Sequence, residues 1–116
     1  MSDYFGDLES RLREFADARD WGGFHSPKNL SMALIVEAAE LVEHFQWLTE
    51  EQSASLAADK RREIGHELAD ILIYLVRIAD RMDIDLPQAV DEKIRINESR
   101  YPADQVRGQS KKYSDY

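Results

Sequence analysis

The stretch from residue 37 to residue 47 reads Glu37-Ala-Ala-Glu-Leu-Val-Glu-His-Phe-Gln-Trp47. Read as a helix, it continues one apolar stripe whose flank carries acidic and aromatic side chains. Carboxylates in that position are expected at the rim of a core. The stripe consists of Leu34, Ala38, Leu41, Val42, Phe45 and Leu48, and its flank of Glu37, Glu40, His44 and Trp47.

Residues 63–78 repeat this arrangement on a second predicted helix. At about 100° per residue, Glu67 and Asp70 hold the same offset from their apolar stripe as Glu37 and Glu40 hold from theirs. If the helices pack through the stripes, up to four carboxylates converge without a Lys or Arg among them. The second stripe consists of Ile64, Leu68, Ile71, Leu75 and Ile78, with Glu63, Glu67, Asp70 and Tyr74 along one side.

Four converging carboxylates are tolerated at pH 7 only if cations enter the cluster. Mg²⁺ suits ligands that are all oxygen, and Mn²⁺ is an alternative. The pattern therefore indicates a divalent-metal site. A second interpretation stays open, because 23 Asp and Glu in 116 residues give about four acid pairs of this spacing by chance. Each pair alone is also typical of a solvated helix face.

The composition bounds the class of protein. A chain of 116 residues with 43% hydrophobic residues, five Gly and three Pro predicts one folded, mostly helical domain. The absence of cysteine excludes disulfides and thiolate sites. A net charge of −8 disfavours nucleic acid and anionic membranes as partners. With no apolar run of 18 residues and no signal-like N-terminus, we expect a soluble, cytoplasmic protein.

The chain order predicts an all-α, four-helix-type bundle with a short connector helix. A helix capped by Ser2 or Asp3 ends at Asp20-Trp21-Gly22-Gly23, which leaves Trp21, Phe24 and His25 on a loop. Further helices are expected from Ser26-Pro27 through residue 47, over 50–57 as the connector, over 59–82, and over 86–100. Arg77 and Arg81 would complement a helix dipole. The predicted domain covers residues 1–101, and 102–116 form an irregular tail.

An ordered set of motifs resembles the MazG-like all-α nucleoside triphosphate pyrophosphohydrolases, most of all their dCTP pyrophosphatase branch. The resemblance spans roughly residues 12–113. It rests on Asp20-Trp21 with Phe24-His25-x-Pro27-x-Asn29-Leu30, then Glu37-x-x-Glu40-Leu-x-Glu-x-Phe-Gln-Trp47, then Glu67-Leu-Ala-Asp70-Ile-Leu-Ile-Tyr74-Leu, then Lys93-x-x-x-Asn97-x-x-Arg100-Tyr101-Pro102.

The resemblance implies Mg²⁺-dependent cleavage between the α- and β-phosphates of dCTP or a modified relative, giving a monophosphate and pyrophosphate in nucleotide-pool house-cleaning. Glu37, Glu40, Glu67 and Asp70 would be the metal ligands and catalytic acids. The family also implies a homo-oligomer, with dimers pairing into a tetramer. Substrate contacts would come from Trp21, His25, Trp47, Tyr74, Lys93, Asn97, Lys111 and Lys112.

Several of these residues also have an ordinary structural explanation. Trp47 and Tyr74 also suit core or interface packing, and His25 also suits a loop histidine that satisfies the backbone. Val36 stands where longer MazG proteins have a second glutamate, which agrees with the dCTP branch. Rival functions are a di-iron carboxylate bundle and a non-catalytic oligomeric interaction module. A di-iron bundle needs two Glu-x-x-His motifs, and this sequence contains only one, Glu63-x-x-His66.

Overall fold

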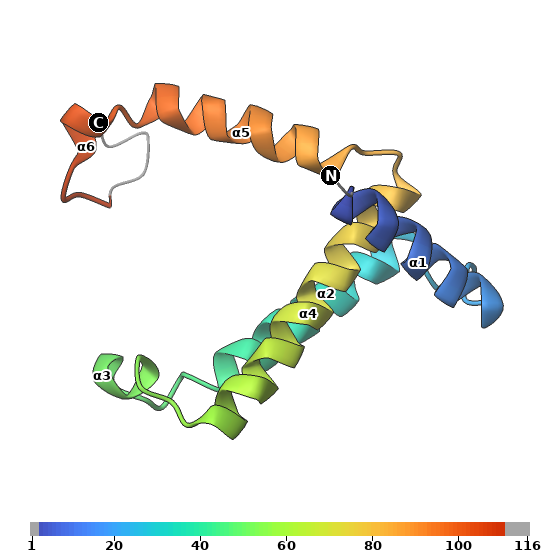
Figure 1. The fold of residues 1–116 in the computed structure, drawn as a ribbon, viewed down its shortest axis with the longest axis horizontal. Helices are drawn as coiled ribbons and strands as arrows, with labels where there is room; N and C mark the ends of the chain where they lie inside the picture. The colour runs from blue at the N-terminus through green and yellow to red at the C-terminus, as the bar shows by residue number, and fades with distance from the viewer. Residues whose placement is uncertain (1–2, 111–116) are drawn as a thin grey trace. The chain divides into compact units, whose positions relative to one another are not determined.

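The computed structural model describes residues 3–110, and all regular secondary structure in that range is helical (Figure 1). The chain divides into two compact units, Met1–Ile84 and Asp85–Tyr116. The all-α prediction is confirmed. The helices are α1 (Tyr4–Ala18), α2 (Pro27–Glu43), α3 (Glu50–Ser53), α4 (Ala58–Arg81), α5 (Leu86–Arg100) and α6 (Ala103–Val106).

Side-chain caps set the starts of the predicted helices. The Ser26 hydroxyl accepts a hydrogen bond from the Asn29 amide, with Pro27 at the first position of α2. Asp3 and Asp85 cap α1 and α5 in the same way. At α3, Thr49 and Gln52 form a complete capping box. These caps satisfy amide groups that have no partner within the helix, so the predicted starts are close to the observed ones.

Helices α1 and α4 end in the same C-terminal capping motif, which was not predicted from the sequence. Asp20 and Asp83 both adopt a left-handed conformation with φ of 53°. The following amide donates back to the helix in each case, from Trp21 to the Ala16 carbonyl and from Ile84 to the Ala79 carbonyl. This is the Schellman arrangement, in which a left-handed residue reverses the chain. Helix α1 therefore ends at Ala18, and Asp20 reverses the chain before the two glycines that were expected to break the helix.

The first unit is built on α4. Helix α2 lies beside α4 along much of its length, and α1 packs on the C-terminal part of α4. The fully buried apolar side chains in the described part are few: Ala16, Leu30, Val76 and Ala79. The side chain of Arg77 is buried with them.

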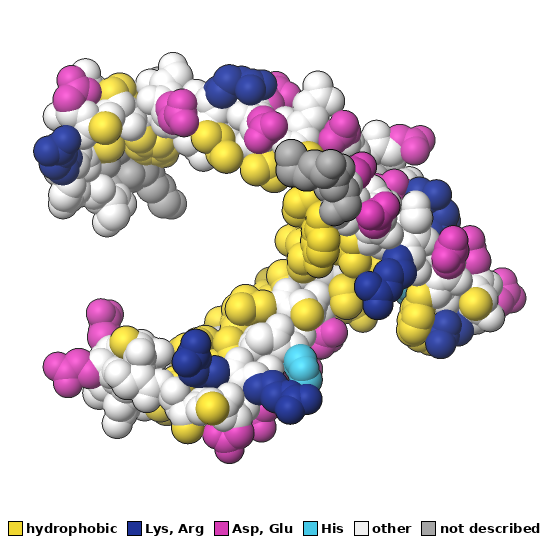
Figure 2. Space-filling model, in the orientation of Figure 1, with side chains coloured by type: hydrophobic (Ala, Val, Ile, Leu, Met, Phe, Trp, Pro, Cys, Tyr) yellow, Lys and Arg dark blue, Asp and Glu magenta, His cyan; other side chains and the backbone are white. Residues whose placement is uncertain are grey.

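Part of the predicted apolar stripes remains exposed in this single chain. Val42, Leu68 and Leu75 belong to the stripes, yet each is at least 40% exposed. Ile35, on α2, is 66% exposed. Figure 2 shows hydrophobic side chains along the surface of the α2–α4 pair. Such an apolar surface is typical of an interface with another chain.

Helix α2 is shorter than predicted, which places Trp47 outside it. The helix ends at Glu43, and residues 44–47 form turns. There the amides of His44 and Phe45 reach carbonyls only three residues back, Leu41 and Val42. These bonds tighten the chain, so the helical period that placed Trp47 on the flank of the stripe no longer holds.

The second unit contains α5 and α6. Every side chain of α5 after Leu86 is exposed. Helix α6 is a single turn within the segment predicted as an irregular tail, and Gly108 follows it with φ of +79°. The predicted domain boundary at residue 101 stays a prediction. None of the described helices combines the length and apolarity needed to cross a bilayer.

Candidate metal centre

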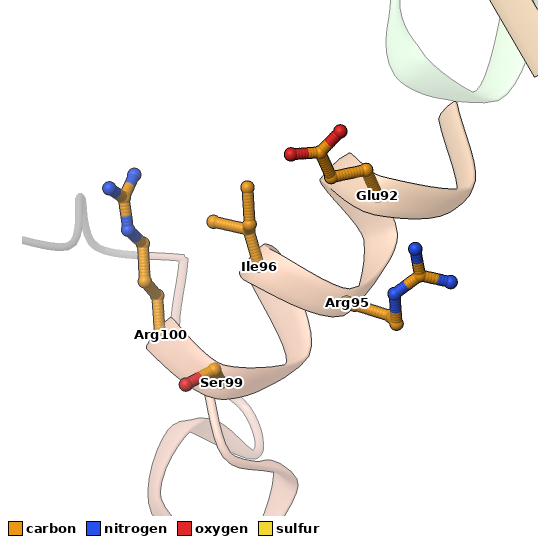
Figure 3. Close-up of a pocket in the computed structure, with 5 residues that line it drawn as sticks. All are labelled: Glu92, Arg95, Ile96, Ser99 and Arg100. Carbon is orange, nitrogen blue, oxygen red and sulfur yellow. The ribbon is translucent and has the colours of Figure 1, made fainter. Parts of the chain in front are cut away.

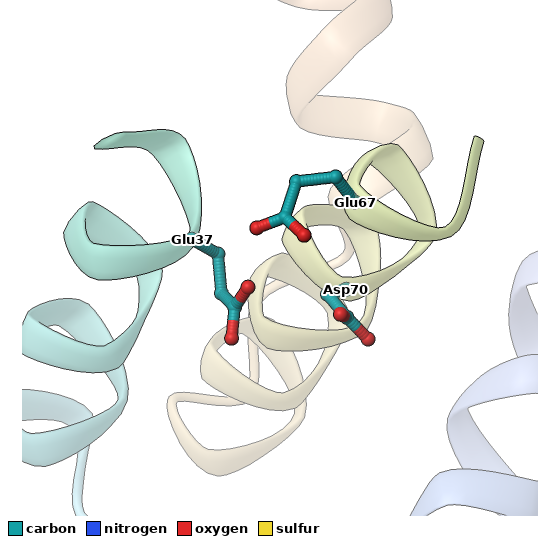
Figure 4. Close-up of side chains that lie close together, drawn as sticks. All are labelled: Glu37, Glu67 and Asp70. Atoms are coloured by element: carbon teal, nitrogen blue, oxygen red, sulfur yellow. The ribbon is translucent and has the colours of Figure 1, made fainter. Parts of the chain in front are cut away.

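Three carboxylates from two neighbouring helices converge in the first unit. Glu37 comes from α2, and Glu67 and Asp70 come from adjacent turns of α4. One oxygen of each lies within 4.8 Å of the others. In Figure 4, Glu37 points across from its helix towards Glu67 and Asp70. The packing of α2 on α4 thus brings together three of the four predicted acids, and their role as ligands stays a prediction.

Two of these carboxylates have an oxygen that is buried and has no hydrogen-bond partner, Glu37 Oε2 and Glu67 Oε1. A buried polar atom without a partner costs free energy, so native proteins rarely leave one. An all-oxygen donor set with two such atoms fits a hard divalent cation. Among the described residues, the cluster consists of carboxylates and has no histidine. This donor set also favours Mg²⁺ or Mn²⁺ over a softer metal.

The electrostatics of the cluster agree with a cation site. Once protonated, the Glu67 carboxyl can donate to the carboxylates of Glu37 and Glu40, and this bonding, together with burial, raises the pKa of Glu67 to about 8. The bond with Glu67 lowers the pKa of Glu37, but burial and the neighbouring Glu40 outweigh it and raise that pKa overall. Without a cation, the cluster therefore holds a proton near neutral pH.

Glu40 lies at the edge of the cluster. Its side chain is exposed, and it is not one of the three acids whose oxygens converge within 4.8 Å. It still interacts with both Glu37 and Glu67, since its carboxylate raises the pKa of each. The structure therefore brings three of the four predicted acids together with Glu40 as an exposed neighbour, and a site of four acids stays a prediction.

The predicted aromatic residues fall into three settings. Tyr74 is half-buried beside the acids, where burial and the charges of Glu37 and Asp70 raise its pKa. Trp21 and His25 lie in the loop between α1 and α2, with ring centroids 5.8 Å apart. Trp47 is 87% exposed in this chain. A core role for Trp47 is therefore wrong, and its exposure agrees with an interface or ligand role.

The predicted basic residues lie in the second unit. Lys93 and Asn97 are exposed on α5, and Lys111 and Lys112 fall outside the described residues. One face of α5 also carries a hollow of about 330 Å³ (Figure 3). Side chains of both charges and an isoleucine line it, and within residues 3–110 all of its lining comes from this one helix. Its lining is Glu92, Arg95, Ile96, Ser99 and Arg100.

Sequence reasoning missed one polar group. Arg77 was expected to complement the dipole at the end of α4, but its side chain is 4% exposed. It pairs with Asp80 and contacts His25. The available signal was the three-residue spacing of Arg77 and Asp80, which places opposite charges one turn apart. Their burial depends on α1 and the loop, which the spacing does not reveal.

Comparison with known proteins agrees with this geometry. The model of the MazG-like family matches residues 32–116, a range that contains the three converging acids. The chain belongs to the MazG-like family. The predicted resemblance is confirmed.

This MazG-like chain is also similar to individual relatives. It is 44% identical to dCTP pyrophosphatase 1 of Mus musculus and 46% identical to that of Bos taurus, over 111 residues in each case. These alignments cover 94% of this chain, but only 65% and 66% of the relatives. A pyrophosphatase from Archaeoglobus fulgidus shares the fold, with a TM-score of 0.71 and 35% identity over 88% of this chain and 95% of that one.

Proposed function

We propose that this protein is a Mg²⁺-dependent nucleoside triphosphate pyrophosphohydrolase. Its substrate would be dCTP or a modified pyrimidine deoxynucleotide, cleaved between the α- and β-phosphates to a monophosphate and pyrophosphate. The role would be house-cleaning of the nucleotide pool. The names of the relatives support the enzyme class: the mouse and bovine proteins are dCTP pyrophosphatases, and the archaeal neighbour is a pyrophosphatase.

One observation carries the proposal. The oxygens of Glu37, Glu67 and Asp70 converge within 4.8 Å in a chain of this family, and two of the carboxylates have a buried oxygen without a partner. Phosphoanhydride cleavage needs positive charge beside the phosphates, and this cluster has the donors to hold it. A divalent ion bound there would neutralise phosphate charge and make phosphorus more electrophilic.

The chain's own residues would divide the remaining work. Glu40 and Asp70 are the two exposed acids of the region, and Glu40 lies outside the three converging oxygens, so it would be free to take a proton from the attacking water. Tyr74 borders the acids, while Trp21 and His25 offer flat rings against which a nucleobase can stack. Lys93 and Asn97, with Lys111 and Lys112, would bind the departing pyrophosphate.

The active form would be a homo-oligomer, with dimers paired into a tetramer. The exposed apolar surface of the α2–α4 pair supports this, because a lone chain would leave Ile35 and Val36 more than half exposed. Ile35→Glu should then lower the mass measured by analytical ultracentrifugation. The matched control is Arg62→Glu, which changes an exposed charged residue of α4 and should leave the mass unchanged.

The decisive experiment incubates purified protein and Mg²⁺ with a panel of nucleotides. Pyrophosphate should be released, most rapidly from dCTP or a modified pyrimidine deoxynucleotide, and the release should be lost in Glu40→Gln and Asp70→Asn. Glu63→Gln, which alters another exposed acid of α4, is the control and should keep activity. Release of orthophosphate alone would reject the proposed cleavage position.

The two rival functions predict other results. A di-iron bundle would contain iron by elemental analysis, but its one Glu-x-x-His motif, Glu63 and His66, lies on an exposed part of α4. An interaction module would show no rise in melting temperature with Mg²⁺ and a non-hydrolysable nucleotide, whereas binding to the folded enzyme must raise it. A cytoplasmic location stays a prediction.

A further inference from the structure

A chain of charged and polar contacts links α1, α4 and the loop that carries Trp21 and His25. Asp80 accepts two hydrogen bonds from Arg13, at 2.6 and 3.1 Å, and a third from Arg77 at 3.0 Å. The Arg77 Nε–H donates to His25 Nδ1 at 3.4 Å. Arg77 is 4% exposed, and a buried guanidinium is tolerated only with partners such as these.

The contact with Arg77 restricts the chemistry of His25. A guanidinium only donates hydrogen bonds and does not lose its proton in proteins. His25 Nδ1 must therefore be an unprotonated acceptor, which leaves the imidazole neutral with its proton on Nε2. Burial and the charges of Arg77 and Arg81 lower the pKa of His25, in agreement with a neutral ring.

The same loop holds the backbone of His25 relative to Trp21. The amides of Phe24 and His25 both donate to the Trp21 carbonyl, at 2.8 and 3.1 Å. The Asn29 side chain donates to the Phe24 carbonyl at 3.2 Å, which ties the loop to α2. Backbone bonds thus fix where the imidazole is attached, and Arg77 fixes its ring orientation and tautomer.

We infer that Arg77 and Asp80 are positioning residues for nucleobase recognition. They hold His25 beside Trp21 in one tautomer, so that its Nε2–H is a fixed donor to an acceptor atom on the base. Asp80 acts one step further away, because it orients the Arg77 guanidinium. This inference rests on the proposed function only for the identity of the ligand, since the tautomer can be measured on the protein alone.

The first test is nuclear magnetic resonance of the full chain with ¹⁵N-labelled histidine. At neutral pH, His25 Nδ1 should give the shift of an unprotonated nitrogen and Nε2 that of a protonated one. Adding Mg²⁺ and a non-hydrolysable nucleotide should shift the Nε2 signal. A proton on Nδ1 in the free protein, or an Nε2 signal unmoved by nucleotide that raises the melting temperature, overturns the inference.

The second test compares Arg77→Lys with Arg81→Gln. The lysine keeps the positive charge but has no Nε–H at the same place, so His25 should populate both tautomers and KM should rise about tenfold, the effect of one hydrogen bond. The kcat should stay within about twofold, because the acids are untouched. Arg81→Gln removes a charge that also acts on His25, yet should keep the tautomer and KM.

The outcomes separate this inference from the proposed function. His25 could have its proton on Nε2 in a protein that neither hydrolyses nor binds any nucleotide. In that case the proposed function and base recognition by His25 are both wrong, and only the tautomer assignment is correct. If the wild type is active but Arg77→Lys folds with unchanged KM, positioning by Arg77 is wrong. If Arg77→Lys does not fold, the wild-type spectra with and without nucleotide decide.

Discussion

Glu37 on α2 and Glu67 on α4 face each other, and each has one carboxylate oxygen that is buried without a hydrogen-bond partner. The folded chain thus brings two acids together at a cost that the unfolded chain does not have. This relationship joins stability, proton binding and cation binding at one place, and it underlies the first two predictions below.

Glu67→Gln should make the metal-free protein more stable at pH 8. The folded state raises the pKa of Glu67 from 4.5 to about 8, so it binds this proton more tightly than the unfolded chain does. The contribution to stability is therefore full below about pH 4.5 and is lost as pH rises to about 8. Melting temperatures in EDTA from pH 5 to pH 8 should show this fall in the wild type and a smaller one in the variant.

Glu63→Gln is the control for that series, since Glu63 is an exposed acid one turn before Glu67. Its melting temperatures should follow the wild type at every pH. Equal pH slopes in the wild type and in Glu67→Gln would mean that Glu67 is not protonated in the metal-free protein.

Binding of Mg²⁺ at pH 7 should release about one proton per site, because a ligating carboxylate must be deprotonated. Glu67, with a pKa of about 8, still holds its proton at that pH. Calorimetric titrations in two buffers with different ionisation enthalpies should give different heats. Heats that do not depend on the buffer would exclude Glu67 as a protonated ligand.

Trp47→Ala should raise the KM for nucleotide by about tenfold or more, the effect of losing one stacked aromatic ring. Because Trp47 is 87% exposed, the free energy of unfolding of the single chain should change by no more than about 0.5 kcal/mol. Steady-state kinetics and urea denaturation measure the two effects. A change of oligomeric mass with unchanged KM would instead assign Trp47 to an interface.

Asp83→Gly should raise the free energy of unfolding by up to about 1 kcal/mol. Asp83 has φ of 53°, a conformation in which glycine has no Cβ penalty. Asp83→Ala should destabilise the protein, because alanine has neither this freedom nor a polar side chain. Asp91→Gly, in the interior of α5, is the matched control and should cost about 0.3 kcal/mol, the difference in helix propensity between Asp and Gly.

The sequence predicted most of what is local. The helix starts at Ser26, Thr49 and Asp85 were readable because a cap depends on residues within one turn. The end of α2 could not be predicted in this way. The tight turn after Glu43 depends on the path of the chain in the folded protein and not on a local cap. Nor could the left-handed aspartates be predicted, because Asp20 and Asp83 resemble any surface acid in the sequence.

By itself, the sequence determined the helical class, the family and the pairing of acids along two helix faces, because helical periodicity and motif order are properties of the chain alone. Only the tertiary structure decided which carboxylate oxygens lie close together and which groups are protonated. The pKa of Glu67 depends on Glu37, thirty positions away, and the state of His25 depends on Arg77. Burial and through-space charge arise only when the helices pack, so no spacing along the chain contains them.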